Sequence, residues 1–235
     1  MKKIFYLIAL IPPLLFSCTE ENLGEPVTTN YTVSIVRECL APEELIPVTD
    51  QALVTLNIRG TEYKEHTDSL LNANFKDILS GTATVTIDYQ GFSQTKYVVN
   101  IIDKESQNTS VKLIPSSGKY AAELSGILSA IGTSIPQDIN IIITPQDTVS
   151  NLIKHNGKGS ISSVYVENLT RKVITAQDGK FTATMPATSA GIGYTIVADD
   201  FIDPNTGLLY KCVAQDINLY SGKKSVVQIK YVQPE

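Results

Sequence analysis

The stretch Thr175-Ala176-Gln177-Asp178-Gly179-Lys180-Phe181 predicts a tight turn that leads into a β-strand. Glycine adopts a positive φ without steric cost, and an aspartate side chain accepts hydrogen bonds from nearby backbone N–H groups, so Asp178-Gly179 favours a turn. From Lys180 onward, polar and apolar residues alternate. That period of two is typical of a strand with one buried face.

The same alternation recurs along both halves of the chain and is interrupted by turn residues, which is the pattern of a β-sandwich. The expected strands of the first half are residues 31–36, 52–58, 83–89, 97–101 and 111–114. Those of the second half are residues 120–130, 139–144, 163–168, 180–185, 194–198, 210–217 and 225–232. The sequence therefore predicts an all-β protein.

The two halves also align with each other. Thr67 corresponds to Thr175, residues 53–57 to 164–168, and residues 85–87 to 194–196. Internal similarity on this scale indicates two tandem units. We expect a first β-sandwich domain at residues 31–115 and a second at 119–235, and residues 27–115 and 119–235 should each fold alone.

The pattern resembles the transthyretin-like, carboxypeptidase-regulatory domain, a seven-stranded sandwich common in surface proteins of the Bacteroidota. Its T-x-x-D-G-x-F turn matches residues 175–181, whereas Leu71-Asn72 departs from it in the first half. Gly91-Phe92 matches the later G-[FY] element better than Asp200-Phe201 does. The resemblance implies two tandem seven-stranded transthyretin-like or Ig-like sandwiches and says little about function.

Residues 1–17 have the features of a secretory signal peptide: a basic start, a short apolar core and a small residue before Cys18. The 13 apolar residues 4–16 would span about 20 Å as a helix, less than the hydrocarbon core of a membrane. Leu15, Ser17 and Cys18 resemble a bacterial lipobox, from which Phe16 departs. The resemblance implies cleavage before Cys18, lipid attachment to it and acylation (palmitate) of the new N-terminus.

Residues 18–30 would then form a lipidated tether. Thr19 is not the aspartate of an inner-membrane retention signal, which favours the outer membrane. Glu20-Glu21 and Glu25 resemble the acidic export tether of surface lipoproteins of the Bacteroidota. The alternative is a solvated linker kept extended by its charges. We expect a lipid-anchored outer-membrane protein at the cell surface.

Composition and motifs argue against several classes of function. The net charge of −5 and the lack of a long basic run argue against nucleic acid as a partner. No nucleophile, phosphate-binding or metal motif occurs, so we expect a protein that is not an enzyme and needs no cofactor or metal. His66 and His155 are expected in exposed loops, and Cys39 and Cys212 as two separate buried thiols.

Two further sets of residues have alternative interpretations. Asp199, Asp200 and Asp203 could supply oxygen ligands to calcium, or could simply form a turn. Ser69 and Thr148 stand in Asp-Ser/Thr-aliphatic stretches that resemble the O-glycosylation acceptor of exported Bacteroidota proteins. The alternative is that both stretches are turns.

We therefore predict a non-enzymatic cell-envelope lipoprotein that acts as an adhesion, spacer or assembly module, with a protein or envelope component as partner. The alternative is a surface glycan-binding accessory lipoprotein of a polysaccharide-uptake system. The chain has no tryptophan to stack on sugars but has 11 tyrosines. An exposed tyrosine pair would favour glycan binding, and an exposed apolar patch would favour a protein partner.

Overall fold

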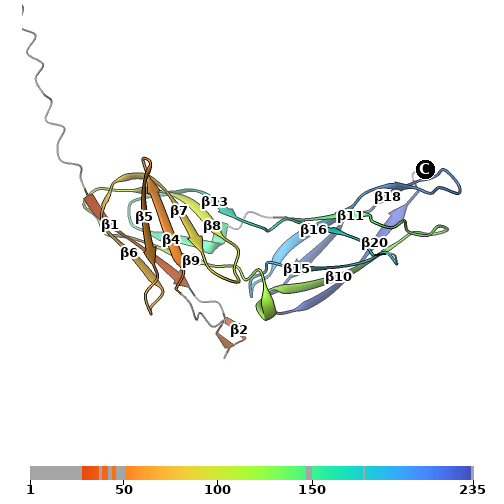
Figure 1. Ribbon diagram of the computed structural model, residues 1–235, viewed down its shortest axis with the longest axis horizontal. Helices are drawn as coiled ribbons and strands as arrows, with labels where there is room; N and C mark the ends of the chain where they lie inside the picture. Colours follow the sequence, from red (N-terminus) through yellow and green to blue (C-terminus); the bar gives the residue numbers. More distant parts are fainter. Residues whose placement is uncertain are drawn as a thin grey trace, which may run out of the picture.

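The computed structural model describes residues 28–36, 39–41, 44–45, 51–146, 150–176 and 178–233. The all-β fold is confirmed, because the described residues form strands and two 3-10 turns, Gly118–Tyr120 and Ser150–Leu152. The strands build two lobes, shown in Figure 1, and a separate hairpin of β2 (Cys39–Ala41) and β3 (Glu44–Leu45).

Lobe 1 contains a four-stranded sheet, β12-β9-β1-β6, and a five-stranded sheet, β13-β8-β7-β4-β5. Its strands are β1 (Thr28–Val36), β4 (Leu53–Ile58), β5 (Thr61–His66), β6 (Asn72–Leu79), β7 (Gly81–Asp88), β8 (Thr95–Ile101), β9 (Gln107–Lys112), β12 (Ile153–Asn156) and β13 (Ile161–Val166).

Lobe 2 contains a five-stranded sheet, β15-β10-β20-β18-β17, and a four-stranded sheet, β14-β11-β16-β19. Its strands are β10 (Ala122–Ser129), β11 (Asn140–Pro145), β14 (Arg171–Ile174), β15 (Lys180–Met185), β16 (Ile192–Ala198), β17 (Phe201–Ile202), β18 (Leu209–Cys212), β19 (Gln215–Leu219) and β20 (Lys224–Val232).

Seven strands of each lobe follow one pairing scheme. β1 is antiparallel to β6 and parallel to β9, as β10 is to β15 and β20. In the facing sheets, β5-β4-β7-β8 corresponds to β14-β11-β16-β19. The counterpart of β4 is thus β11, and the expected match of residues 53–57 with 164–168 is wrong, because alternation alone does not reveal which strand pairs with which.

The turn that leads into β6 and β15 repeats in atomic detail. The hydroxyl of Thr67 accepts a hydrogen bond from the Ala52 N–H at 3.0 Å, and that of Thr175 accepts one from the Ile139 N–H at 3.0 Å. Both threonines are buried. Gly179 adopts φ +71°, and Leu71 occupies the equivalent place at φ +63°. The expected correspondence of Thr67 with Thr175 is confirmed.

Each lobe buries its own apolar cluster, built from the inward-facing side of its strands. Tyr89, Tyr97 and Tyr194 lie in these cores, as the strand pattern predicts. Tyr165 does not: it faces away from the core of lobe 1 and is 59% exposed.

The second half of the chain also supplies two strands to lobe 1. β12 pairs antiparallel with β9, and β13 pairs antiparallel with β8. The segment that carries them has residues in both cores, with Ile161 and Val164 against the first and Leu152 and Val166 in the second. Independent folding of residues 27–115 and 119–235 stays a prediction, but the range 119–235 contains two strands of the first sandwich.

The lobes are arranged end to end (Figure 1). β1 starts at the outer end of lobe 1, and β20 ends at the opposite, outer end of lobe 2. At the junction, the Ala187 N–H donates to the Pro115 carbonyl at 3.3 Å, and Pro115 also bridges to Phe92. An anchor that precedes β1 would therefore leave lobe 2 as the outermost part.

Candidate functional site

The structure places the two glycosylation candidates differently. Ser69 is exposed in the connection between β5 and β6, whereas Thr148, like Cys18, lies outside the described residues. Beside Ser69, the Asp68 Oδ1 accepts the backbone N–H groups of Leu70 and Asn72, each at 2.9 Å. Asp68 thus forms a turn, which leaves the Ser69 hydroxyl accessible and its modification a prediction.

The aspartates proposed for calcium are each engaged within the protein. The Asp199 Oδ2 accepts the Asn140 amide at 2.8 Å, and the Asp200 Oδ1 accepts the Cys212 N–H at 2.8 Å. Asp203 accepts the Asn205 N–H at 3.0 Å and the Thr206 hydroxyl at 2.7 Å, and these bonds lower the pKa of its carboxyl group. Among the described residues no group of three or more potential ligands gathers. The turn interpretation accounts for Asp203, whereas Asp199 and Asp200 accept hydrogen bonds from residues of other strands.

Histidine and cysteine residues differ partly from expectation. His66 is exposed but ends strand β5. His155 lies half-buried within β12, so its expected place in an exposed loop is wrong. Cys212 is a free thiol that accepts the Ala198 N–H at 3.2 Å, and burial raises its pKa. The side chain of Cys39 lies outside the described residues.

A buried polar cluster lies where β12 meets lobe 1. The Tyr31 hydroxyl donates to Thr109 Oγ1 at 2.6 Å and lies 2.9 Å from the Tyr97 hydroxyl. Thr109 Oγ1 lies 2.8 Å from His155 Nδ1. Burial raises the pKa of Tyr31 to about 12, raises that of Tyr97 well above its ordinary value and lowers that of His155.

A hydroxyl beside an imidazole is also the arrangement of a nucleophile and its base. Thr109, however, is fully buried, and His155 Nε2 is buried with no hydrogen-bond partner among the described residues. A substrate has no access to this hydroxyl, and no third group orients the imidazole. The cluster therefore holds β1, β8, β9 and β12 together and is not a reaction centre.

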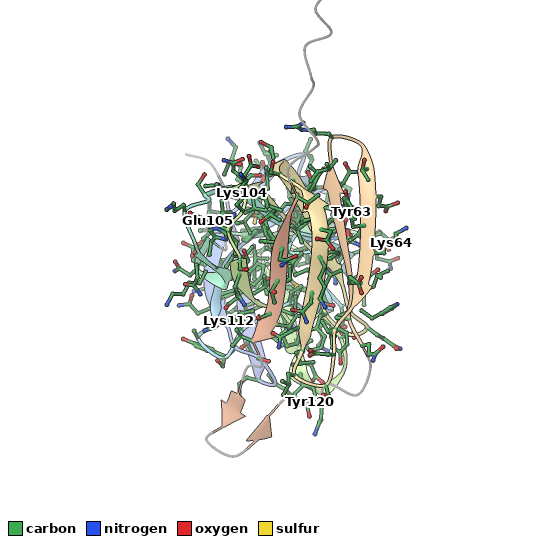
Figure 2. The ribbon with its side chains drawn as sticks, turned by 90° about the vertical axis from the view of Figure 1, so that its left-hand side faces the viewer. Tyr63, Lys64, Lys104, Glu105, Lys112 and Tyr120 are labelled. Atoms are coloured by element: carbon green, nitrogen blue, oxygen red, sulfur yellow. The ribbon has the colours of Figure 1, made fainter. Side chains whose placement is uncertain are left out.

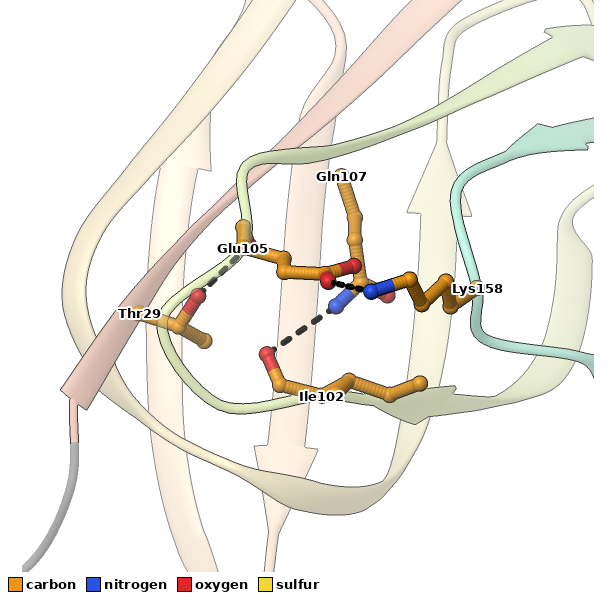
Figure 3. A network of polar contacts seen from close by, with 5 residues as sticks. All are labelled: Thr29, Ile102, Glu105, Gln107 and Lys158. Carbon is orange, nitrogen blue, oxygen red and sulfur yellow. Dashed lines mark hydrogen bonds and ion pairs between the residues drawn. The ribbon is translucent and has the colours of Figure 1, made fainter.

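A second polar network closes the outer end of lobe 1 (Figure 3). The Thr29 hydroxyl donates to the Glu105 carbonyl at 2.7 Å, and the Glu105 carboxylate pairs with Lys158, whose pKa it raises. The Gln107 side chain donates to the Ile102 carbonyl at 3.0 Å. These contacts fix the start of β1 and the β12–β13 connection to the loop between β8 and β9.

The outer face of the four-stranded sheet in lobe 1 is polar. Thr32 donates to Asn74 at 3.0 Å, Ser34 to Asn72 at 2.6 Å, and Asn108 to Ser34 at 3.0 Å. Figure 2 views the molecule from the outer end of lobe 1 and shows Lys104, Glu105 and Lys112 on the surface. The five polar side chains thus hydrogen-bond one another across the sheet.

The equivalent sheet of lobe 2 presents aliphatic and basic side chains instead. Val226 in β20 is 81% exposed, and Ile202 in β17 is 63% exposed. The cross-strand register places Leu209 beside Ile202 and Lys211 beside Val232. We call this outer surface of β10, β20, β18 and β17 the distal face; its exposed aliphatic members are Ile127, Ile202, Leu209, Val226 and Val232.

The charges of the distal face are mostly lysines. Lys224 pairs with Glu123 at 2.7 Å, which raises the pKa of the lysine. Lys211 and Lys230 are exposed and form no ion pair with the described residues. Exposed apolar groups next to basic ones mark a surface suited to a partner with apolar and acidic groups.

Sequence reasoning missed this surface, although β20 contains a signal for it. In residues 225–232, valine stands at outward positions 226 and 232 as well as in the inward row. A strand that is aliphatic on both faces is either buried on both sides or exposes one apolar face.

No protein-family model matches this chain, and no curated protein matches it. Among the described residues no helix is long and apolar enough to cross a membrane. Solved structures that resemble it include the minor pilin GBS52 of Streptococcus agalactiae, with 10% identity, a TM-score of 0.42 and coverage of 88% of this chain and 97% of that one.

Two others are the Bacillus anthracis TIE protein, with 13% identity and a TM-score of 0.33, and a streptococcal ancillary pilin, with 9% identity and a TM-score of 0.37. They cover 88% and 89% of this chain. The chain spans only 34% of the TIE protein chain and 64% of the ancillary pilin chain.

Proposed function

We propose that this protein is a non-enzymatic, lipid-anchored module of the cell envelope that binds a protein or another envelope component through its distal face. The exposed distal face is the observation that supports this proposal. It combines the exposed aliphatic side chains of Ile202, Val226 and Val232 with Lys211 and Lys230, which form no ion pair within the described part of the chain. Lobe 1 would act as the spacer between this face and the anchor.

Anchoring through Cys18 supports the same arrangement. A lipidated N-terminus would hold the molecule at the start of β1, at the end opposite to the distal face (Figure 1). Two or more acyl chains give stable anchoring that a single chain does not. Changing Cys18 to Ala is expected to release the protein from the detergent phase, and retention there would contradict the lipid anchor.

Glycan binding has less support. The two tyrosines with large exposure, Tyr165 and Tyr220, belong to different lobes, since Tyr165 lies in β13 of lobe 1 and Tyr220 follows β19 of lobe 2. They therefore do not form the stacking pair that a sugar site would use.

Site-specific photo-cross-linking in intact cells tests the proposed contact. A photoreactive residue at position 226 should capture an envelope partner. The matched control is position 108, because Asn108 pairs with β1 as Val226 pairs with β10. Equal capture at both positions, or capture at neither, would refute the distal face as the contact surface.

A further inference from the structure

The two lobes differ at one edge of their second sheets. β8 of lobe 1 corresponds to β19 of lobe 2, because each pairs antiparallel with the strand that follows the central pair, β7 and β16. In lobe 1 that sheet continues beyond β8 to β13. In lobe 2 it ends at β19.

In lobe 1, β13 covers the edge of β8. The Asn100 N–H points away from β7 and donates to the Ser160 carbonyl at 3.0 Å, and β13 then pairs with the rest of β8. Under this cover the inward side chains of β8 are almost completely buried, with Tyr97 1% and Val99 0% exposed.

The edge of lobe 2 lacks such a cover. The Gly193 carbonyl accepts the Gln146 N–H, so the backbone N–H and C=O of Gly193 point toward β11. Because these groups alternate in direction along a strand, those of Tyr194 point toward β19. The register then directs the backbone of Ile217 toward β16 and that of Asp216 and Asn218 outward. In the described part of the chain these outward groups have no backbone partner. Ile217, the counterpart of Val99, is only half-buried.

Most other outer strands carry features that prevent strand addition. Edge strands usually carry charged residues or are very short, and both features hinder the addition of a further strand. The residues concerned are Glu62, Lys64 and Glu65 in β5, Lys76 and Asp77 in β6, Lys154 in β12, Arg171 and Lys172 in β14, and Lys180 in β15, while β17 has two residues. Among the described outer strands, β13 carries no charged residue and β19 carries only Asp216.

We propose that β19 of one molecule accepts the open edge of β13 from a second copy of this chain. The faces match when the two strands run parallel, since Val164 and Val166 of β13 would continue the row of Ile217, while Ser163 and Tyr165 would lie beside Asp216 and Asn218. Aliphatic–aliphatic and polar–polar neighbours stabilise paired strands. Because donor and acceptor edges differ and every copy has both, the contact is heterologous and extends into chains.

Cysteine cross-linking of the full chain in mild detergent tests this pairing. The background carries Cys39→Ser and Cys212→Ser, and a short bismaleimide joins Tyr165→Cys to Asp216→Cys, both at exposed positions. We expect covalent dimers and longer species that increase with protein concentration. The matched control joins Tyr165→Cys to Lys172→Cys, which is exposed on β14, the other edge of the same sheet.

A proline in the accepting edge distinguishes strand pairing from random collision. Asn218→Pro removes an outward N–H and should lower cross-linking about tenfold, the effect of losing one backbone hydrogen bond at the contact. Lys172→Pro removes an outward N–H from β14 and should leave cross-linking unchanged. Equal cross-linking in the Lys172→Cys control, dimers of the Tyr165→Cys single variant, or no cross-linked species at all would each overturn the proposal.

Discussion

The two lobes share one strand order but differ in what lies at equivalent positions of it. Where lobe 1 has Tyr31 and Thr109 in its polar cluster, the register of lobe 2 places Leu124 and Val227. On the outer face, lobe 1 is again the more polar of the two. Lobe 1 has Ser34 and Asn108 where lobe 2 has Ile127 and Val226.

These differences follow from what each lobe contacts. The polar cluster of lobe 1 includes His155, which arrives with β12 from the second half of the chain. Lobe 2 receives no strand from elsewhere in the described chain, and its equivalent core positions are aliphatic. The same fold is thus adapted in lobe 1 to receive strands from the second half of its own chain and in lobe 2 to present an exposed face.

The largest expected effect on stability comes from giving lobe 2 a pair of core residues that lobe 1 has at the equivalent positions. An added Cβ at Gly126 would lie 2.2 Å from the Phe181 ring, whereas lobe 1 places Val33 opposite Ala73 at this position. Gly126→Val should lower the free energy of unfolding by about 3 kcal/mol through overpacking. Adding Phe181→Ala recreates the pair of lobe 1 and should recover part of that loss.

Urea unfolding of the two single variants and the double variant measures this coupling. Phe181→Ala alone should cost about 3–5 kcal/mol because it leaves a cavity. Losses that simply add in the double variant would show that the two positions are not equivalent to Val33 and Ala73.

The second prediction concerns the segment between β12 and β13. A Cβ at Gly159 would lie 2.2 Å from the Asn100 carbonyl oxygen. Gly159→Ala should therefore displace β12 and β13 from lobe 1, cost about 2 kcal/mol and accelerate hydrogen exchange of the Asn100 amide. The control is Gly60→Asn, since Gly60 has open space and a φ of +86° that asparagine tolerates. Unchanged exchange at Asn100 would mean that the β12–β13 segment does not protect β8.

Sequence reasoning predicted most of the strands whose two faces differ, but it missed β6, in which Ala73, Phe75 and Ile78 face the core. β1 and β7 alternate strongly and were expected at residues 31–36 and 83–89. β5 is exposed at most positions, and β14 consists of Arg171-Lys172-Val173-Ile174, so neither sequence shows an alternation of polar and apolar residues. The position of β13 beside β8 was unpredictable, because its partner is more than 60 residues earlier and alternation carries no information about distant pairing.

The same reasoning explains which site residues could be predicted. The turn role of Asp203 follows from local residues, and its hydrogen bonds to Asn205 and Thr206 lie within the same turn. The burial of His155 depends on Thr109, which is distant in sequence. The distal face likewise depends on four strands, β10, β20, β18 and β17, that meet only in the folded lobe.

The third prediction tests the buried hydroxyl of Tyr31 at alkaline pH. The pKa of Tyr31 is raised to about 12 in the folded state, above the ordinary value of 10.0. Between these values the unfolded chain releases the phenolic proton while the folded chain retains it, so this stability is present below pH 10.0 and lost as pH rises toward about 12. Tyr31→Phe removes this dependence. Between pH 9 and pH 11 its free energy of unfolding should fall by about 1 kcal/mol less than that of the unaltered chain.

Urea midpoints at several pH values measure that difference. Leu124→Phe in lobe 2 is the matched control, because Leu124 takes the place of Tyr31 and has no proton to release. Its pH dependence should equal that of the unaltered chain. A Tyr31→Phe variant with unchanged pH dependence would show that this hydroxyl does not stabilise the protonated fold.

The smallest expected effect on stability is the exchange of outer-face residues. Val226→Asn with Ile127→Ser gives lobe 2 the side chains that lobe 1 carries at these positions. Because both side chains are exposed, 81% and 38%, the free energy of unfolding should change by no more than about 0.5 kcal/mol per site. Partner capture should nevertheless fall, since the apolar part of the distal face is removed. A loss of several kcal/mol in urea unfolding would instead make these residues part of the fold's own packing, and the contrast between a spacer lobe and a binding lobe would not hold.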